Sequence, residues 1–211
     1  MGSKVFITGT DTEVGKTWST VSVVRALREQ SASVKALKPV ACGLDDGGCN
    51  DDIEALLVAQ NLNHAEQINR YRFALPAAPS QAAAAEGMVV DPSGLVRWCH
   101  EQSNAVETCL IEGVGGVMTP ITALWLVSDW IEAMPDCEVW LVVGCKLGAI
   151  NQSLLTLAKL EQINRSPTRI FFNATSPENN AWIQPVRGAI APFIEDNCHV
   201  IEIQYLEGIT L

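Results

Sequence analysis

Apolar runs alternate with helical patterns along most of this chain. The alternation predicts an α/β fold, a doubly wound and mostly parallel sheet with helices on both faces. The run Trp140-Leu141-Val142-Val143 is continuously apolar, as expected for a strand covered on both faces in the middle of the sheet. We expect strands near residues 4–8, 34–37, 108–111, 139–143, 169–172 and 200–203. We expect helices near residues 16–29, 52–59, 92–102, 127–133, 148–164 and 177–187, with a short one around 82–85.

The ends of the predicted strands are unusually polar or glycine-rich. In open α/β sheets, ligands bind beyond the carboxyl ends of the strands. Any one of these segments could be an ordinary turn, but together they predict a ligand site at one edge of the sheet. The segments are residues 9–17, 38–43, 112–116 and 144–148, and a fifth strand ends at Asn173.

Residues 7–17, with the sequence ITGTDTEVGKT, lie between an apolar run and a predicted helix. A loop that ends in Gly-Lys-Thr surrounds nucleotide phosphates with backbone N–H groups. Lys16 would neutralise charge on the β and γ phosphates, and the Thr17 hydroxyl would reach Mg²⁺. Thr10 stands where the common pattern has glycine, and the nearest glycine is Gly9. The context still predicts a nucleoside triphosphate site of the P-loop NTPase type.

Two acids and two lysines near the strand ends are candidates for phosphate chemistry. Glu112 follows an apolar strand and is the best candidate for a carboxylate ligand of Mg²⁺. The spacing around Asp52 favours an acid in the first turn of a capped helix. Lys38 could stabilise charge that develops during phosphoryl transfer, or it could be a surface lysine, and Lys146 poses the same choice. Because these strand ends carry no Ser-His-Asp arrangement, positioning and charge neutralisation would dominate catalysis.

Composition narrows the classes of partner. The chain has 211 residues, of which 48% are hydrophobic, and 24 acidic against 14 basic side chains give a net charge of −10. Net negative charge disfavours nucleic acid and anionic membrane surfaces as partners. The N-terminus opens directly into a strand, and no apolar run approaches the roughly 20 residues that span a bilayer. We therefore expect a cytoplasmic protein, with residues 1–211 forming a single P-loop domain that binds neither nucleic acid nor membrane.

Cysteine and histidine provide no sign of a structural metal site. The seven cysteines include no C-x-x-C pair, and we expect most of them to be small buried thiols in a reducing compartment. His64, His100 and His199 are far apart in sequence, which argues against structural zinc.

Taken together, the motifs resemble the dethiobiotin synthetase family. The matching segments run in the family's order over about residues 4–175, and the variant loop is itself a family feature. They are residues 8–17, 38–43, 50–52, 112–116 with Thr119-Pro120, and 144–151.

This resemblance implies an ATP- and Mg²⁺-dependent cyclo-ligase of biotin biosynthesis. Its substrates would be 7,8-diaminopelargonic acid (diaminopelargonate) and carbon dioxide. The reaction would pass through a carbamate and a carbamic-phosphoric anhydride to dethiobiotin, releasing ADP and phosphate. The family enzyme is a homodimer with its site at the subunit interface.

Family roles also follow by matching position. The resemblance implies that Mg²⁺ is held by Thr17, Asp52 and Glu112, which overrules the helix-cap interpretation of Asp52. The implied ATP-binding residues are Glu13, Val14, Gly15, Lys16, Thr17, Asp52, Glu112, Gly113, Val114 and Gly115, with Asn173, Ala191, Pro192 and Phe193 facing adenine. The implied catalytic residues are Thr12, Lys16 and Lys38. Substrate would contact Thr12, Lys38 and Cys42, and Gly148, Ala149, Ile150 and Asn151 of the other subunit.

Three features depart from the family pattern. Cys42 stands where serine is common, and a thiol is a poorer hydrogen-bond donor than a hydroxyl. Residues 76–80 stand where many relatives carry Ser-Pro-His, and the end of the chain from residue 201 is short.

Two other classes of protein share the motifs. One is a P-loop switch or partitioning ATPase, and the other is a ligase acting on a larger cobyrinate-type substrate. Against the switch stand the scattered basic residues, the lack of an amphipathic membrane-binding tail and the 38–43 segment, which a switch does not require. Against the larger ligase stands the short chain, which leaves little room for a second domain.

Overall fold

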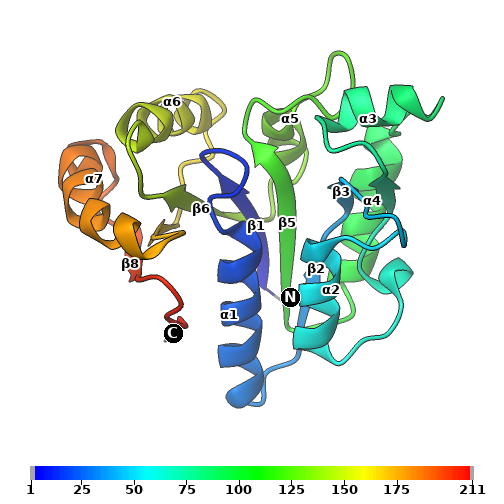
Figure 1. Ribbon diagram of the computed structural model, residues 1–211, viewed down its shortest axis with the longest axis horizontal. Helices are drawn as coiled ribbons and strands as arrows, with labels where there is room; N and C mark the ends of the chain where they lie inside the picture. Colours follow the sequence, from blue (N-terminus) through cyan, green and yellow to red (C-terminus); the bar gives the residue numbers. More distant parts are fainter. Residues whose placement is uncertain (1–2, 210–211) are drawn as a thin grey trace.

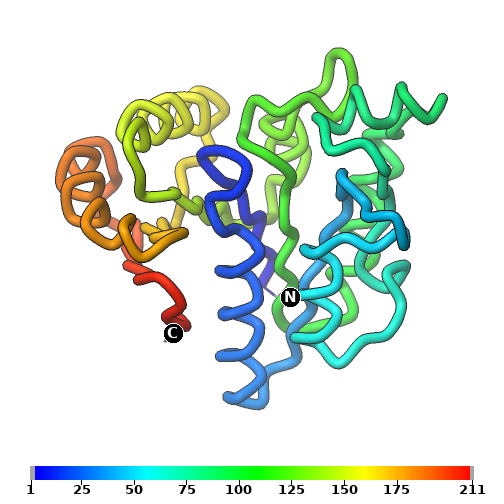
Figure 2. The backbone as a smooth tube through the Cα atoms, viewed as in Figure 1, coloured from blue at the N-terminus to red at the C-terminus, as the bar shows by residue number. Residues whose placement is uncertain are grey.

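The computed structural model describes residues 3–209 (Figures 1 and 2). Its main sheet has the strand order β2-β5-β1-β6-β7-β8, and every neighbouring pair is parallel. Helices surround this sheet, so the predicted α/β class is confirmed. The strands are β1 (Ser3–Gly9), β2 (Val34–Leu37), β5 (Thr108–Gly116), β6 (Glu138–Gly144), β7 (Arg169–Asn173) and β8 (His199–Ile203).

The helices match most of the predicted positions. Their bounds are α1 (Lys16–Glu29), α2 (Asp51–Gln60), α3 (Pro79–Ala85), α4 (Pro92–Ser103), α5 (Val127–Glu132), α6 (Ala149–Gln162) and α7 (Ile183–Ile190). Three short 3₁₀ segments accompany them, namely η1 (Ala65–Gln67), η2 (Pro177–Trp182) and η3 (Ala191–Phe193). The single helix predicted over 177–187 is therefore η2 followed by α7.

The start of α2 shows how local signals orient a functional residue. The Asn50 side chain caps this helix by accepting a hydrogen bond from the Ile53 N–H. Asp51 and Asp52 lie in the first turn, where acids are favourable. Because Asn50 supplies the cap, the Asp52 carboxylate is left to face the strand ends.

The apolar core lies against the central strands. β6 is inside the sheet, between β1 and β7, as its continuous apolar run predicted. Phe6 of β1 packs edge-on against Trp130 of α5, with ring centroids 5.0 Å apart, and both side chains are fully buried. The Trp125 ring also packs against Trp130, with ring centroids 6.2 Å apart. This aromatic group joins the sheet to α5.

Two features of the sheets differ from prediction. Val40–Cys42 (β3) and Tyr71–Phe73 (β4) form a separate parallel pair that the sequence pattern did not predict. Glu112 was expected at a strand end but lies within β5, where it pairs with Ile7. β5 continues to Gly116 beyond a local irregularity in its pairing with β1, so the glycine-rich segment is still strand.

The cysteines largely follow expectation. All seven are free, and Cys99, Cys109, Cys137 and Cys145 are buried. Cys42 and Cys198 are partly buried, whereas the expectation of burial is wrong for exposed Cys49.

Across residues 3–209, the structure contains no helix with the length and apolarity needed to traverse a membrane.

Replacing Trp130 with alanine should lower the free energy of unfolding by about 3–5 kcal/mol, since it removes a large buried ring and leaves a cavity. Urea denaturation would measure the change. The matched control is Trp182→Ala, where 36% of the residue is exposed and the expected loss is below about 1 kcal/mol. Equal losses in the two variants would contradict the assigned core.

Candidate functional site

A cavity of about 1100 Å³ lies beyond the carboxyl ends of the central strands. Most residues predicted to bind nucleotide or substrate line its wall. They are Thr12, Glu13, Gly15, Lys16, Thr17, Lys38, Cys42, Asp52, Val114, Gly115 and Asn173. Val14 and Glu112 are buried beneath this wall, and Gly113 follows Glu112 in β5. The structure therefore brings residues from the segments 9–17, 38–43 and 112–116 together with Asn173, whereas none of residues 144–148 lines this cavity.

Tight packing explains the variant phosphate-binding loop of residues 9–17. A Cβ on Gly9 would come within 2.7 Å of Val14 Cγ2, so the folded-back loop requires glycine at position 9. Gly15 has a left-handed φ of 91°, and a Cβ there would meet the Asn173 amide at 2.1 Å. The Asn173 Nδ2 donates to the Val14 carbonyl at 2.9 Å. Asn173 thus holds the loop from β7 and also lines the cavity.

Lys16 is buried at the start of α1, and its Nζ donates to the Asp11 carbonyl at 2.8 Å. Burial, followed by repulsion from Lys38, lowers the pKa of Lys16 to about 8. Negative phosphate groups would oppose both effects. The loop therefore presents a lysine whose charge is costly until an anion binds.

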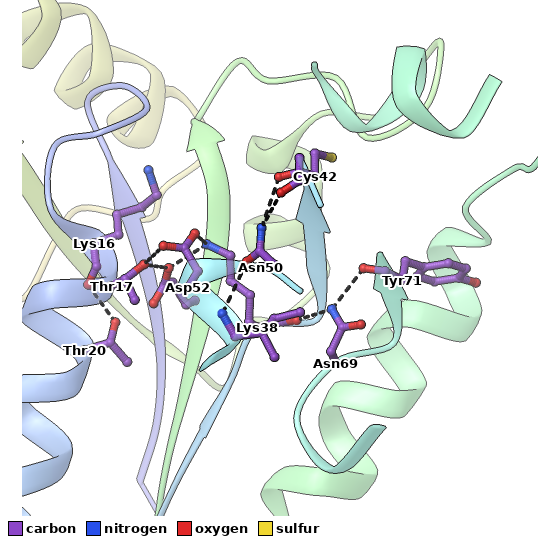
Figure 3. Close-up of polar contacts among 12 residues, drawn as sticks. Lys16, Thr17, Thr20, Lys38, Cys42, Asn50, Asp52, Asn69 and Tyr71 are labelled. Carbon is purple, nitrogen blue, oxygen red and sulfur yellow. Dashed lines mark hydrogen bonds and ion pairs between the residues drawn. The ribbon is translucent and has the colours of Figure 1, made fainter. Parts of the chain in front are cut away.

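Lys38 forms ion pairs with two carboxylates, and its contact with Asp52 can be followed in Figure 3. Its Nζ is 2.6 Å from Glu112 Oε1 and 2.7 Å from Asp52 Oδ2. Lys38 and Glu112 are almost fully buried, whereas the Asp52 side chain is 41% exposed. Burial opposes the charge on Lys38, but the two carboxylates outweigh it and raise the pKa of this lysine. Lys38 likewise keeps the pKa of Asp52 below its usual value, against the opposing effect of burial.

The same oxygens form a suitable site for Mg²⁺. The Thr17 hydroxyl lies 2.6 Å from Asp52 Oδ1 and 2.7 Å from Glu112 Oε1. Glu112 Oε2 is buried without a hydrogen-bond partner, so it has capacity for a further ligand. Mg²⁺ prefers hard oxygen donors and usually keeps waters and phosphate oxygens. Residues 3–209 contain no cluster of three His, Cys, Asp or Glu side chains that could hold a metal ion.

Two asparagines hold the segment that carries Lys38 and Cys42 (Figure 3). Asn69 Nδ2 donates to the carbonyls of Lys38 at 2.8 Å and Tyr71 at 3.0 Å. Asn50 Nδ2 donates to the carbonyl of Cys42 at 3.3 Å and to the next carbonyl along the chain at 3.1 Å. Burial raises the pKa of the Cys42 thiol to about 11, which makes it neutral near pH 7. Asn69 was missed because a lone asparagine in a loop carries no sequence signal.

The start of α6 lies outside the wall of this cavity. Gly148 was predicted to be the first residue of the helix. In the structure it is the N-cap that precedes α6, with a φ of 89°. None of residues 148–151, nor Lys146, lines the cavity in the part of the chain that the structure describes. The next residue, Gln152, does line it, and its Nε2 donates to Asp11 Oδ2 at 2.8 Å. Sequence reasoning missed this contact.

The far end of the cavity combines β7 with the C-terminal segment. It is lined by Asn173, Ala174, Thr175, Tyr205 and Leu206. The Trp18 Nε1 donates to the Glu207 carbonyl at 3.1 Å, which places the C-terminal segment beside α1 (Figure 2).

The predicted adenine-facing turn lies elsewhere. Ala191, Pro192 and Phe193 form η3, and Phe193 is 61% exposed. Among residues 3–209, the cavity wall does not include this turn, so its role in adenine binding stays a prediction.

Solved structures share the fold at low identity. A structure of chloroplast FtsY from Physcomitrella patens aligns with 100% of this chain at a TM-score of 0.52 and 15% sequence identity. The chain spans 60% of the length of that structure. The likeness concerns the fold alone.

Closer similarity appears among curated proteins. A family model described as an AAA domain matches residues 3–203. The ATP-dependent dethiobiotin synthetase BioD of Methylobacterium nodulans is 40% identical over 169 residues, covering 75% of each chain. BioD 1 of Salmonella typhi is 38% identical over 166 residues, covering 77% of this chain and 72% of that protein. This chain therefore belongs to the ATP-dependent dethiobiotin synthetase family.

Proposed function

We propose that this chain is the cyclo-ligase that converts 7,8-diaminopelargonic acid and carbon dioxide into dethiobiotin at the expense of ATP. The observation that carries the proposal is the cluster of Thr17, Lys38, Asp52 and Glu112 beside the phosphate-binding loop. A hydroxyl, an ammonium and two carboxylates at one point suit the binding of a magnesium triphosphate. Residues 1–211 would act as a single domain. We also expect the protein to be located in the cytoplasm.

The chemistry would proceed by transfer between bound substrates. One substrate amine adds to carbon dioxide and loses a proton, giving a carbamate. A carbamate oxygen attacks the γ phosphorus of ATP, and ADP leaves. The second amine then attacks the carbonyl carbon, expels phosphate and loses a proton, which closes the ring. No protein nucleophile is required, so the side chains act by positioning and charge neutralisation.

The two lysines would stabilise negative charge at different places in the cavity. Lys16 would lie beside the phosphates, where negative charge develops on the β phosphate as ADP leaves. Lys38 lies on the side of Cys42, toward which the diamine would bind, and Thr12 completes that end. Lys38 is already stabilised as a cation by its carboxylates, so its charge is present before substrate arrives.

Magnesium would be held by Thr17, Asp52 and Glu112. Bound there, the ion would neutralise negative charge on the β and γ phosphates. The buried Glu112 Oε2 supports this assignment, because it has no hydrogen-bond partner among the described residues and can accept a further ligand. Adenine would bind near Asn173, and its predicted contact with Ala191, Pro192 and Phe193 of η3 is part of this proposal.

A homodimer would complete the substrate site. The Ala149 N–H donates to the Lys146 carbonyl, which leaves the Ile150 and Asn151 N–H groups at the start of α6 to receive an anion. These groups lie outside the wall of their own cavity, which supports the assignment of residues 148–151 to the partner's substrate carboxylate. Exposed Leu147 and Leu155 would lie near such an interface.

The direct test mixes the protein with MgATP, bicarbonate and diaminopelargonate and follows phosphate release. Release should depend on the diamine, and Lys16→Ala and Lys38→Ala should each lower it by at least about 100-fold. Since Lys38→Ala leaves Glu112 as an unpaired buried charge, its folding is checked by circular dichroism. Release that ignores the diamine and accompanies dimerisation would support a P-loop switch. Normal turnover by a folded Lys38→Ala variant would exclude the role assigned to Lys38.

Lys16→Met should be more stable than the native chain near pH 7 in the absence of nucleotide and divalent cation, because it removes a costly buried charge. Between pH 8 and 10.5 the folded chain releases the Lys16 proton while the unfolded chain keeps it. The unfolded state then binds more protons, so the native chain gains stability relative to the variant.

Urea titrations of both proteins across this pH range would measure the stability difference, which should narrow as pH rises. Lys159→Met on α6 is the control, with an expected change below about 0.5 kcal/mol. A Lys16→Met difference that stays constant with pH would contradict the lowered pKa of Lys16.

Cys42→Ser should keep or improve the apparent affinity for the diamine, because a hydroxyl donates a stronger hydrogen bond than a neutral thiol. Steady-state KM for diaminopelargonate is the measurement. Exposed Cys49→Ser provides the control and should leave KM unchanged. A large loss of activity in Cys42→Ser would count against the placement of Cys42 at the substrate.

A further inference from the structure

Helix α6 reaches the phosphate-binding loop through the side chain of Gln152. Its Nε2 donates to Asp11 Oδ2 at 2.8 Å, although the two residues are 141 positions apart in sequence. Both residues line the cavity. They follow β1 and β6, which are neighbours in the sheet. The contact therefore links two segments that meet at the site.

Asp11 also forms hydrogen bonds with the rest of the loop. Its Oδ1 accepts the Thr12 N–H at 2.8 Å, and its backbone carbonyl accepts Lys16 Nζ at 2.8 Å. One side of Asp11 is thus bound to α6, and the other is bound to the loop backbone and the buried lysine. A displacement of Asp11 would move the groups that meet the phosphates.

The amide of Gln152 is only half satisfied. Its Oε1 is buried without a hydrogen-bond partner. The hydroxyl of Thr10, the residue before Asp11, is also buried without a partner. An unpartnered buried acceptor is unfavourable. An apolar side chain at position 152 would avoid that cost but would also leave Asp11 Oδ2 without its donor. The charge-assisted bond to Asp11 offsets the cost of the unpaired oxygen.

We propose that Gln152 is a positioning residue that holds the phosphate-binding loop in its binding shape through Asp11, and thereby sets the place of Lys16. The inference rests on the proposed function only in taking MgATP as the bound ligand. Glutamine suits this role because it is a neutral donor. Leucine has no donor, and an ionised glutamate would repel Asp11.

The first experiment needs no ligand. Hydrogen exchange of the Thr12 amide, which Asp11 holds, is compared in the native protein, Gln152→Leu and the control Gln162→Leu. Gln162 is exposed in the last turn of the same helix. Gln152→Leu should speed exchange by about tenfold, the scale of one charge-assisted hydrogen bond, while the control should leave it unchanged. Unchanged exchange in Gln152→Leu would overturn the proposal.

The second experiment measures MgATP affinity at about pH 7 and about pH 5.5. Gln152→Leu should weaken binding by about tenfold at both values. At about pH 7, Gln152→Glu should also lower the affinity for MgATP, because the introduced carboxylate repels Asp11. At about pH 5.5 this variant should regain much of the lost affinity, because the introduced carboxyl can carry a proton and donate a hydrogen bond to Asp11. Lys16, whose Nζ contacts the Asp11 carbonyl, and Lys38, which repels Lys16, both stay largely protonated across this range.

A purely structural role would not produce this pattern. Identical behaviour of Gln152→Glu and Gln152→Leu at both pH values, or native affinity in Gln152→Glu at about pH 7, would overturn the proposal.

The two proposals can fail separately. Phosphate release that ignores the diamine would remove the synthetase assignment and leave the exchange result intact. Diamine-dependent release by a Gln152→Leu variant with native loop exchange and native MgATP affinity would remove the positioning role alone.

Discussion

A lysine and a glutamate buried side by side determine how the strand ends of this sheet are arranged. β2 and β5 pair with Leu37 opposite Ile111, and the residues that follow are Lys38 and Glu112. Neither side chain could be buried alone, since an uncompensated charge in the interior is very unfavourable. Strand pairing therefore brings the ion pair together, and the ion pair in turn favours this pairing. Asp52 and Thr17 complete the arrangement from α2 and α1.

The same constraint prepares the site for its ligands. Two carboxylates face the single ammonium of Lys38, so the cluster retains negative charge that a divalent cation can neutralise. The positive charge on Lys16, by contrast, is disfavoured by burial and by repulsion from Lys38. Phosphate binding would stabilise the positive charge on Lys16. Magnesium binding would neutralise the excess negative charge on the two carboxylates. The site thus holds a positive charge on Lys16 and excess negative charge on the two carboxylates, which a magnesium nucleotide would neutralise together.

Local sequence predicted the parts of this site that depend on one strand and its loop. The phosphate-binding loop and the acid that follows Ile111 could be placed because they adjoin continuous apolar runs. Asp52 could not be assigned by spacing, since a first-turn acid looks the same whether or not it faces a ligand. The structure separates these roles because Asn50 provides the cap. Three-residue strands such as β3 and β4 are also too short for an alternating pattern to be distinctive.

Other contacts depend on distant parts of the chain. Asn69 reaches the Lys38 carbonyl across 31 positions, and Gln152 reaches Asp11 across 141. No local pattern marks either residue, because an isolated amide is equally compatible with a solvated surface. Only the order of the strands brings each amide to its partner. The residues that hold the site in place are therefore harder to predict than those that meet the ligand.

The variant loop shows why motif positions can shift without loss of function. Backbone N–H groups contact the phosphates, so the ligand itself does not require glycine at position 10. Glycine is required where another side chain occupies the space of a Cβ, and here Val14 occupies the space beside Gly9. Val14 is itself held by Asn173 of β7. The position of glycine in this loop thus reflects how the loop packs against Val14 and β7.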